Sequence, residues 1–441
     1  MDVGLTSLKK SATRPTRMTA KHLTSRRLII ASLATALCLW GIWQAARIGI
    51  ARTAGENAGL SGQTSTADLA VRLSPADAET HYARGDLLQQ ISDYPQAKTE
   101  FERAVQLRPR DYYLWLVLGV TRDADQDQEG ALRALRQSAS LAPSYAKPSW
   151  QLGNLLLRMG QIDQAFEELR KSARMDPSTL PVTIDLAWGL SQHDPQKVAA
   201  LLQPETDSTR LALALFFAKH TQSAAAAQQF LLTNGTNGTN GTSEAKAEAL
   251  LDELLKTRAF NDAYQVWARM RGVPATGSGF FDGGFEGWLA TGQAGFGWQI
   301  APSIANVEMS VDTSEHQSGG RSLRVEFRGN SNPAASLLTQ LILVKPNTHY
   351  RISFAAQTRD FVSVAAPIVT IKDVSDPKDI ILAQSPALLT AKGGWQQFSL
   401  DITTSAPTHA IAISLARQPC ANDPCPAFGL LWLDSFELTT R

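Results

Sequence analysis

Hydrophobic positions recur along this chain with three different spacings, and each spacing predicts a different kind of structure. Residues 28–46, LIIASLATALCLWGIWQAA, carry no charge. At a rise of about 1.5 Å per residue, a helix of this length can cross a hydrocarbon layer ~30 Å thick. From residue 67 to 272 the apolar positions follow the spacing of amphipathic helices. After residue 278 they alternate with polar positions in short runs, which is typical of β-strands.

The uncharged run follows a basic leader. Before residue 28 Asp2 is the one acid, against seven basic residues: Lys9, Lys10, Arg14, Arg17, Lys21, Arg26 and Arg27. Because basic flanks stay in the cytoplasm, the pattern predicts a cytoplasmic tail at 1–27 and a transmembrane helix at 28–48. The rest of the chain is then periplasmic, making a single-pass inner (plasma) membrane protein. A cleaved signal peptide is the alternative, although its apolar core is usually shorter, about 7–15 residues.

A 34-residue pattern begins at Ala78 and recurs at Tyr112 and Ala146. Three sets of residues fall in register: Gly85, Gly119 and Gly153; Ala97, Ala131 and Ala165; Pro109, Pro143 and Pro177. The pattern resembles the tetratricopeptide repeat, which implies pairs of antiparallel helices stacked into a solenoid. Weaker helical patterns extend this array over residues 67–272, with linkers expected at 49–66 and 273–278.

The resemblance implies that the array binds proteins or peptides on its concave face. The three clear repeats hold 13 Lys or Arg and 14 Asp or Glu residues, and the whole chain has a net charge of +1. A nucleic-acid partner is therefore not expected. Tyr112, Tyr113 and Trp150 are candidates for the lining of the groove, with packing in the core as the alternative.

Ten short alternating runs fill residues 279–441 and predict a β-sandwich. The stretches FFDGGFEGW, SGGRSLRVEF, HYRISFAAQT, GWQQFSLDIT and LLWLDSFEL follow one another in this order. Together they resemble the carbohydrate-binding, galactose-binding-like jelly rolls. The expected fold is thus multidomain α + β, with one transmembrane helix, an α-solenoid and a C-terminal jelly roll.

Two kinds of site follow from the second resemblance. Many members hold a structural calcium ion that joins the first and last strands, and Glu286 and Asp434 match those positions; solvated carboxylates are the alternative. Sugar sites need exposed aromatic rings. Trp288 and Trp395 match positions that usually pack inside the fold, which leaves Trp298 and Phe361 as candidate ligand-binding rings.

Two further features concern the cellular compartment in which the chain after the transmembrane helix lies. Cys420 and Cys425 stand five positions apart before the last strand, and outside the cytoplasm they are expected to form a disulfide; free thiols are the alternative. Asn234, Asn237 and Asn240 each begin an Asn-Gly-Thr sequon, in a stretch whose composition is that of a flexible loop.

We find no sequence motif of an enzyme and no metal-ligand spacing among the seven His residues. The sequence therefore predicts a non-enzymatic, membrane-anchored scaffold of the cell envelope without a certain cofactor. Its array recruits proteins, and its jelly roll contacts glycan or protein, in the assembly or export of an exopolysaccharide. A membrane-tethered lectin-like module and a hydrolase with an unrecognised site are the alternatives.

Overall fold

The computed structural model describes residues 18–234, 241–274, 277, 279–287, 289, 294–390, 394–420 and 424–441, with side chains from residue 27 and, after the gap, from residue 243. Trp288, Asn237, Asn240 and the side chains of the basic leader before Arg27 lie outside this description. The chain divides into two compact units, Met1–Thr183 and Ile184–Arg441. Each unit is described by itself.

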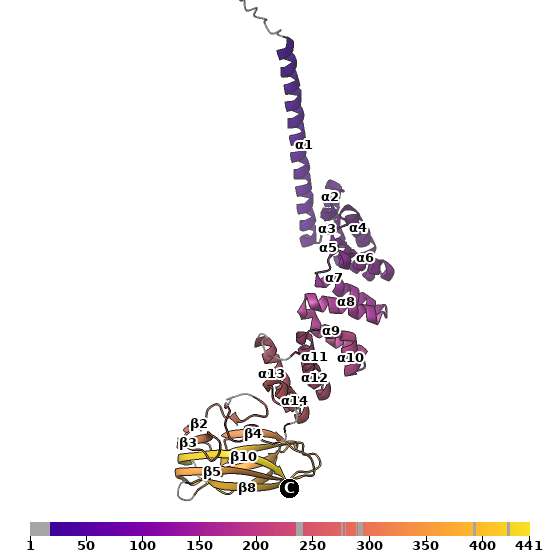
Figure 1. The fold of residues 1–441 in the computed structure, drawn as a ribbon. Helices are drawn as coiled ribbons and strands as arrows, with labels where there is room; N and C mark the ends of the chain where they lie inside the picture. The colour runs from indigo at the N-terminus through magenta and orange to yellow at the C-terminus, as the bar shows by residue number, and fades with distance from the viewer. Residues whose placement is uncertain are drawn as a thin grey trace, which may run out of the picture. The chain divides into compact units, whose positions relative to one another are not determined.

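Helices and short turns form the described part of the first unit and the beginning of the second (Figure 1). Aspartates start five of the described α-helices: Asp77, Asp93, Asp111, Asp127 and Asp194 each accept a hydrogen bond from a backbone N–H of the first turn. In chain order the helices are α1 Met18–Ser61, α2 Thr64–Leu73, α3 Ala78–Gln90, α4 Tyr94–Leu107, α5 Tyr112–Ala124, α6 Gln128–Leu141, α7 Ala146–Arg158, α8 Ile162–Met175, the 3-10 turn η1 Pro177–Thr179, α9 Leu180–Leu190, α10 Pro195–Leu202, α11 Asp207–Lys219, α12 Ser223–Leu231, α13 Gly241–Lys256 and α14 Phe260–Arg271.

Close contacts between paired helices explain the repeated glycines. A Cβ atom added at Gly85 would lie 2.8 Å from the ring of Phe101. The equivalent atom at Gly119 would lie 2.6 Å from the side chain of Leu135, one repeat later. The large residue of each second helix thus fills the space that the glycine of the first helix leaves open, as the repeat pattern predicts.

The long helix α1 differs from the expectation for residues 49–66. It continues without a break to Ser61, and α2 follows after Gly62 and Gln63, so this stretch is helical rather than a linker. Ala51 and Ala58 are fully buried, and the Arg52 guanidinium forms a bidentate ion pair with Asp77, at 2.7 and 3.1 Å. Small residues on one face let α1 pack against α2 and α3, which makes its second half part of the array.

Two five-stranded antiparallel sheets form the C-terminal sandwich, with orders β1-β4-β9-β6-β7 and β2-β3-β10-β5-β8. Side chains from the inner faces of both sheets make one continuous core. The strands are β1 Gln299–Ile300, β2 Val307–Asp312, β3 Ser322–Asn330, β4 Leu338–Leu343, β5 His349–Ser363, β6 Pro367–Asp373, β7 Ile380–Gln384, β8 Gln396–Thr403, β9 Ala410–Arg417 and β10 Pro426–Thr440.

The last helix pair and the sandwich contact each other within the second unit. The Arg258 guanidinium, between α13 and α14, donates to the carbonyl oxygens of Val374 and Asp376, the latter at 2.9 Å. Trp267 on α14 is 2% exposed and packs against Phe296 with 5.8 Å between ring centres. The last helix pair, before residue 273, and the sandwich, after residue 278, therefore pack against each other.

Candidate functional site

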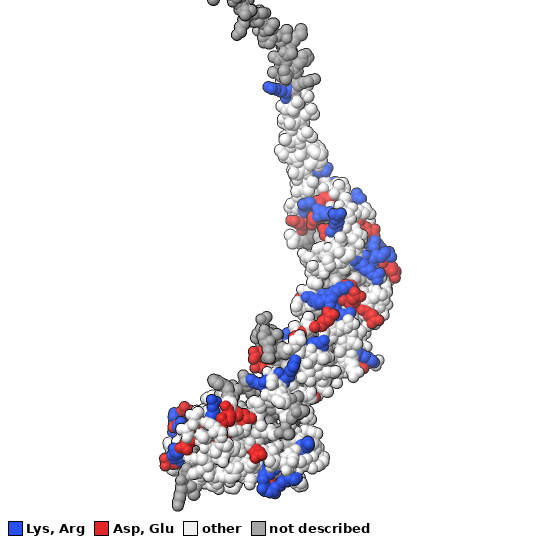
Figure 2. All heavy atoms as spheres, in the orientation of Figure 1, with Lys and Arg blue, Asp and Glu red and all other residues white. Residues whose placement is uncertain are grey.

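Residues 28–46 of α1 expose their apolar side chains. Leu28, Leu37, Trp40 and Ile42 are each more than 60% exposed, and no Lys, Arg, Asp or Glu interrupts the surface of this segment (Figure 2). By length and composition the helix can cross a membrane, a test that a signal sequence near an N-terminus also passes.

A groove of about 450 Å³ runs along the first helices of the three clear repeats. Its wall is mixed: aliphatic side chains from α5, two tyrosines, three glutamines, one acid and one base. The lining residues are Asp86, Gln89, Gln90, Tyr94, Tyr113, Leu116, Val117, Val120, Lys147 and Gln151. The groove thus offers amide donors and acceptors around an apolar floor, with balanced charge.

Of the aromatic residues expected in this groove, the structure places Tyr113 in the wall. Its hydroxyl lies 3.5 Å from that of Tyr82, and the Lys147 ammonium lies 6.0 Å from the centre of its ring. Burial and the hydroxyl of Tyr113 raise the pKa of Tyr82 above its usual value, so Tyr82 stays a neutral hydrogen-bonding group.

The other two candidates, Tyr112 and Trp150, do not line the groove. Tyr112 packs against Tyr145, with 5.0 Å between ring centres, and Trp150 is half-buried on α7 without contributing to the wall. Consecutive helix positions point about 100° apart, and here Tyr113 faces the groove while Tyr112 faces Tyr145.

In the sandwich, Glu286 and Asp434 hold the same loop, residues 315–321. Asp434 is fully buried, and its Oδ2 accepts hydrogen bonds from the backbone N–H groups of Gln317 and Ser318, at 2.7 and 2.9 Å. Glu286 Oε1 accepts the N–H of Gly320 at 2.7 Å. Gly319, between Ser318 and Gly320, has a φ of +66°, a backbone conformation that is strained for any residue with a side chain.

These contacts bear on the expected calcium ion. Ca²⁺ takes six to eight oxygen ligands, and one loop is approached by Glu286 from the segment before β1 and by Asp434 from β10. Among the described residues, however, no three His, Cys, Asp or Glu side chains gather into a metal-binding group. Backbone carbonyls would have to complete the set, so the calcium site stays a prediction.

The structure contradicts the choice of Trp298 as an exposed ligand-binding ring. Trp298 is 6% exposed, its Nε1 donates to the carbonyl of Asp282 at 2.8 Å, and its ring stacks on Phe285. Phe361 also turns inward, packing edge-on against Phe327 at 5.3 Å. Both rings serve the core because each lies on the inner side of its strand or loop.

An exposed ring that the sequence did not single out is Phe428 on β10, which is 50% exposed. It pairs with Val362 on β5, which is 68% exposed. Its neighbour Gly429 has a φ of +110°, and a Cβ there would collide with the backbone of Asp360. The pairing of β10 with β5 shifts register between Phe428 and Leu430. A glycine inside a strand pattern is the sequence signal for such an irregularity.

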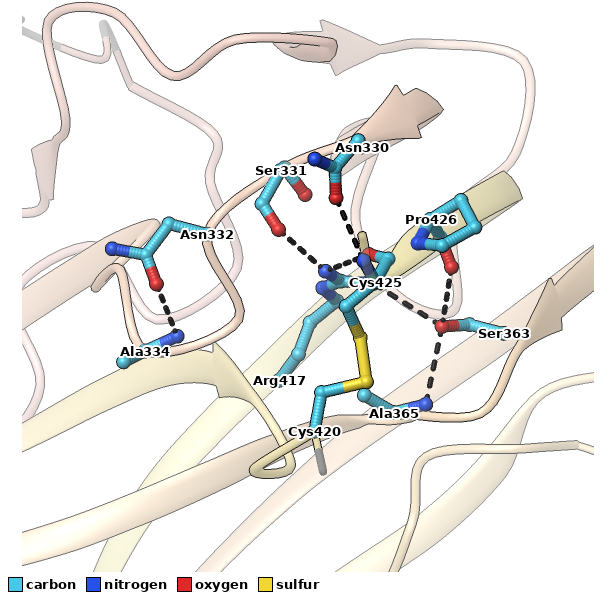
Figure 3. Close-up of a disulfide and its surroundings, with 10 residues drawn as sticks. All are labelled: Asn330, Ser331, Asn332, Ala334, Ser363, Ala365, Arg417, Cys420, Cys425 and Pro426. Atoms are coloured by element: carbon cyan, nitrogen blue, oxygen red, sulfur yellow. Dashed lines mark hydrogen bonds between the residues drawn. A yellow bond between two sulfur atoms is a disulfide. The ribbon is translucent and has the colours of Figure 1, made fainter. Parts of the chain in front are cut away.

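Cys420 and Cys425 form a disulfide beside a buried arginine (Figure 3). Arg417 is 3% exposed, and its Nη2 donates to the carbonyls of Ser331 and Cys425, both at 2.7 Å. Its Nη1 donates to Ser363 Oγ at 3.1 Å, and burial lowers the pKa of the guanidinium. Arg417 thereby ties the disulfide loop to the loop after β3 and to the end of β5.

Comparisons with known proteins agree with both halves of the chain. A family model described as "Carbohydrate binding domain" matches residues 275–420. The model described as "Tetratricopeptide repeat" matches residues 78–111 and 146–179. The chain therefore carries tetratricopeptide repeats and a C-terminal carbohydrate-binding domain.

Similar individual proteins match one half at a time. Protein bimA of Emericella nidulans is 31% identical over 107 residues, which are 24% of this chain and 13% of bimA. The crystal structure of MamA shares 15% identity, covering 47% of this chain and 97% of MamA, at a TM-score of 0.29. A structure titled "CBM4 structure and function" shares 16% identity over 37% of this chain and 99% of its own, at a TM-score of 0.27.

Proposed function

We propose that this chain is a membrane-anchored, non-enzymatic scaffold of the cell envelope. Its array binds a protein partner, its sandwich contacts a carbohydrate, and α1 holds both at the periplasmic face of the inner membrane. The observation that carries the proposal is the groove of about 450 Å³ on the repeats, in a chain that also has a carbohydrate-binding domain. The finer proposal is a role in the assembly or export of an exopolysaccharide, where a protein and a glycan must be held together.

The walls of the groove indicate what kind of peptide it would take. Glutamine amides such as Gln89 and Gln151 can donate to and accept from the backbone of an extended peptide. Val117 and Val120 offer an apolar floor, while Asp86 and Lys147 balance each other in charge. We therefore propose an extended, largely uncharged peptide segment as the occupant.

Position-specific crosslinking tests the groove. A photoreactive phenylalanine analogue at position 113, in the wall, is expected to capture one defined envelope protein in living cells. The same analogue at position 145 is the control, because Tyr145 is 58% exposed and is absent from the lining. Equal capture at the two positions, or none at position 113, would refute the proposed groove.

Topology is tested separately. Alkaline phosphatase fused after Arg441 is expected to be active, since that enzyme needs an oxidising compartment. An inactive phosphatase fusion, with an active cytoplasmic reporter at the same place, would reverse the orientation. Glycan binding without any crosslinked protein would instead favour a membrane-tethered lectin-like module.

A further inference from the structure

The outer face of the sheet β2-β3-β10-β5-β8 carries an apolar row along its central strand. Phe428, Leu430 and Trp432 alternate with the core residues Leu431 and Leu433, so their side chains share the outer face. Four residues of strand span about 13 Å. The row therefore gives this face an apolar centre, of which Phe428 is the exposed end.

Polar side chains flank the row on β3, and polar and apolar side chains flank it on β5. On β3 the residues paired with Phe428, Leu430 and Trp432 are Arg328, Glu326 and Arg324. On β5 the corresponding partners are Val362, Arg359 and Gln357. The apolar centre thus lies between a polar β3 edge and a β5 edge on which Val362 is apolar, Arg359 is charged and Gln357 is buried.

One end of the row is open and the other is covered. Phe428 is 50% exposed, beside Val362 at 68%. Trp432 is 2% exposed, because the Arg359 guanidinium lies over its ring at 4.9 Å from the centre and Asp312 accepts its Nε1–H at 2.9 Å. The accessible ring is therefore Phe428, and the fixed Trp432 supports the row from the other end.

The bulge between β5 and β10 explains why Phe428 is accessible. Asp360 and Phe361 together face Gly429, and the register between the strands shifts here. Phe361 turns into the core, Val362 turns out, and Asp360 takes a strained φ of +52°. Bulges redirect side chains, and they occur often beside binding sites.

The charges on this face balance one another. Arg328 pairs with Glu308 at 2.8 Å and with Glu326 at 2.8 Å, and Arg359 pairs with Glu315 at 2.5 Å. Such a surface has no excess charge to attract an acidic or a basic polymer. It does present donors and acceptors at fixed positions around an apolar ring, which suits the hydroxyl groups and the apolar ring face of a neutral sugar.

We infer that the Phe428–Leu430–Trp432 row and its polar edges are a binding surface for a neutral oligosaccharide. The apolar face of one sugar ring stacks on Phe428. The side chains of Arg328, Glu326 and Arg359 bind the hydroxyl groups. This inference rests on the proposed carbohydrate-binding role of the domain and assigns a place to it.

The test uses the full-length chain in detergent and titration calorimetry. The probes are cellohexaose, xylohexaose and mannohexaose, with an oligogalacturonate as the acidic comparison. We expect at least one neutral hexasaccharide to bind. Phe428→Ala should weaken that binding about tenfold or more, which corresponds to about 1.4 kcal/mol, while Phe428→Trp should retain it. Ile381→Ala is the matched control, because Ile381 is 56% exposed on β7 of the opposite sheet.

The other outcomes separate this inference from the proposed function. If a hexasaccharide binds equally well to the wild type and to Phe428→Ala, the domain binds carbohydrate elsewhere and the inference is wrong. If only the oligogalacturonate binds, the domain still binds carbohydrate, but the proposed surface for a neutral oligosaccharide is refuted. If no probe binds, the inference is overturned, while crosslinking at position 113 still decides the scaffold role.

Discussion

Trp267 on α14 packs edge-on against Phe281 at the beginning of the jelly roll, with 5.1 Å between their ring centres. This contact couples the last helix pair to the carbohydrate-binding domain. Trp267 also lies against Gly295, where any side chain would collide with the indole. The jelly roll thus completes part of its buried surface with a helix that belongs to the array.

Replacing Trp267 with Ala is expected to lower the free energy of unfolding of the second unit by about 3–5 kcal/mol, because the change leaves a large cavity. The measurement is urea denaturation followed by circular dichroism. Leu190→Ala, at a 50% exposed position on α9, is the control and should change little. Residues 279–441 made alone should melt at a lower temperature than in the full chain; identical melting would show that the helices contribute nothing.

Acid should weaken the contact between Asp312 and Trp432. Burial acts to raise the pKa of Asp312, but hydrogen bonds from Ser314 and Trp432 outweigh it and lower that pKa to about 2. The carboxylate therefore stabilises the fold fully above its ordinary value of 3.8 and loses this contribution as the pH falls toward 2.

Asp312→Asn should remove about 1–2 kcal/mol at neutral pH. The same substitution should flatten the dependence of stability on pH between about 4 and 2. Melting temperatures of the two proteins across that range provide the measurement. A parallel pH dependence in wild type and variant would contradict the role of Asp312.

Asp434→Asn should destabilise the sandwich by about 1–3 kcal/mol, because a side-chain amide cannot accept all the backbone N–H groups that the carboxylate accepts. Differential scanning calorimetry measures this loss. The matched control is Asp401→Asn, since Asp401 is about half exposed and pairs with Arg351 at the surface. That control should change the melting temperature little.

The same Asp434→Asn variant tests the calcium site. Calcium should raise the melting temperature of the wild-type chain if Glu286 and Asp434 are its acidic ligands, and a chelator should reverse the increase. The substitution is expected to abolish this response. If calcium does not change the melting temperature of the wild type, the predicted calcium site is wrong.

Replacing both Cys420 and Cys425 with Ala should cost about 2 kcal/mol, as expected for a short closed loop. The substitution should also weaken the hydrogen bond that Arg417 Nη2 donates to the carbonyl of residue Cys425. Limited proteolysis should then cleave the chain near the loop. A variant as stable and as resistant as the wild type would show that Arg417 holds the loop without the disulfide.

Arg52→Ala should loosen the second half of α1 from the array and cost about 1–2 kcal/mol, because Asp77 loses a charged hydrogen-bond partner. Arg103→Ala on α4, an exposed position, is the matched control. Hydrogen exchange at residues 51–61 provides the measurement. Unchanged exchange would show that Ala51 and Ala58 hold the helix in place by packing alone.

The sequence predicted the elements well where a single periodic signal dominates. Gly85 and Phe101 are matched in the first repeat as Gly119 and Leu135 are in the second, because helix pairing requires a small residue opposite a large one. The alternating runs likewise predicted a sandwich. In both cases the apolar pattern reports which face is buried.

The site was less predictable because its features depend on departures from the pattern. Trp298 lies near a turn, yet its ring packs between Phe280 and Phe285. In the sequence, Phe428 is one residue of an alternating strand pattern. In the structure, the bulge in β5 opposite Gly429 makes its side chain accessible. The helical continuation of α1 was missed because small residues such as Ala51 and Ala58 give no amphipathic signal.

The unbroken α1 has a mechanical consequence. Trp43, in the exposed apolar segment, and Ala51, in the array, stand eight residues apart on one helix, a distance of about 12 Å and rather more than two turns. With no hinge between them, a partner that pulls or twists the array also tilts or turns the segment proposed to lie in the bilayer. Movement of the array would then reach the far end of this segment through one continuous helix.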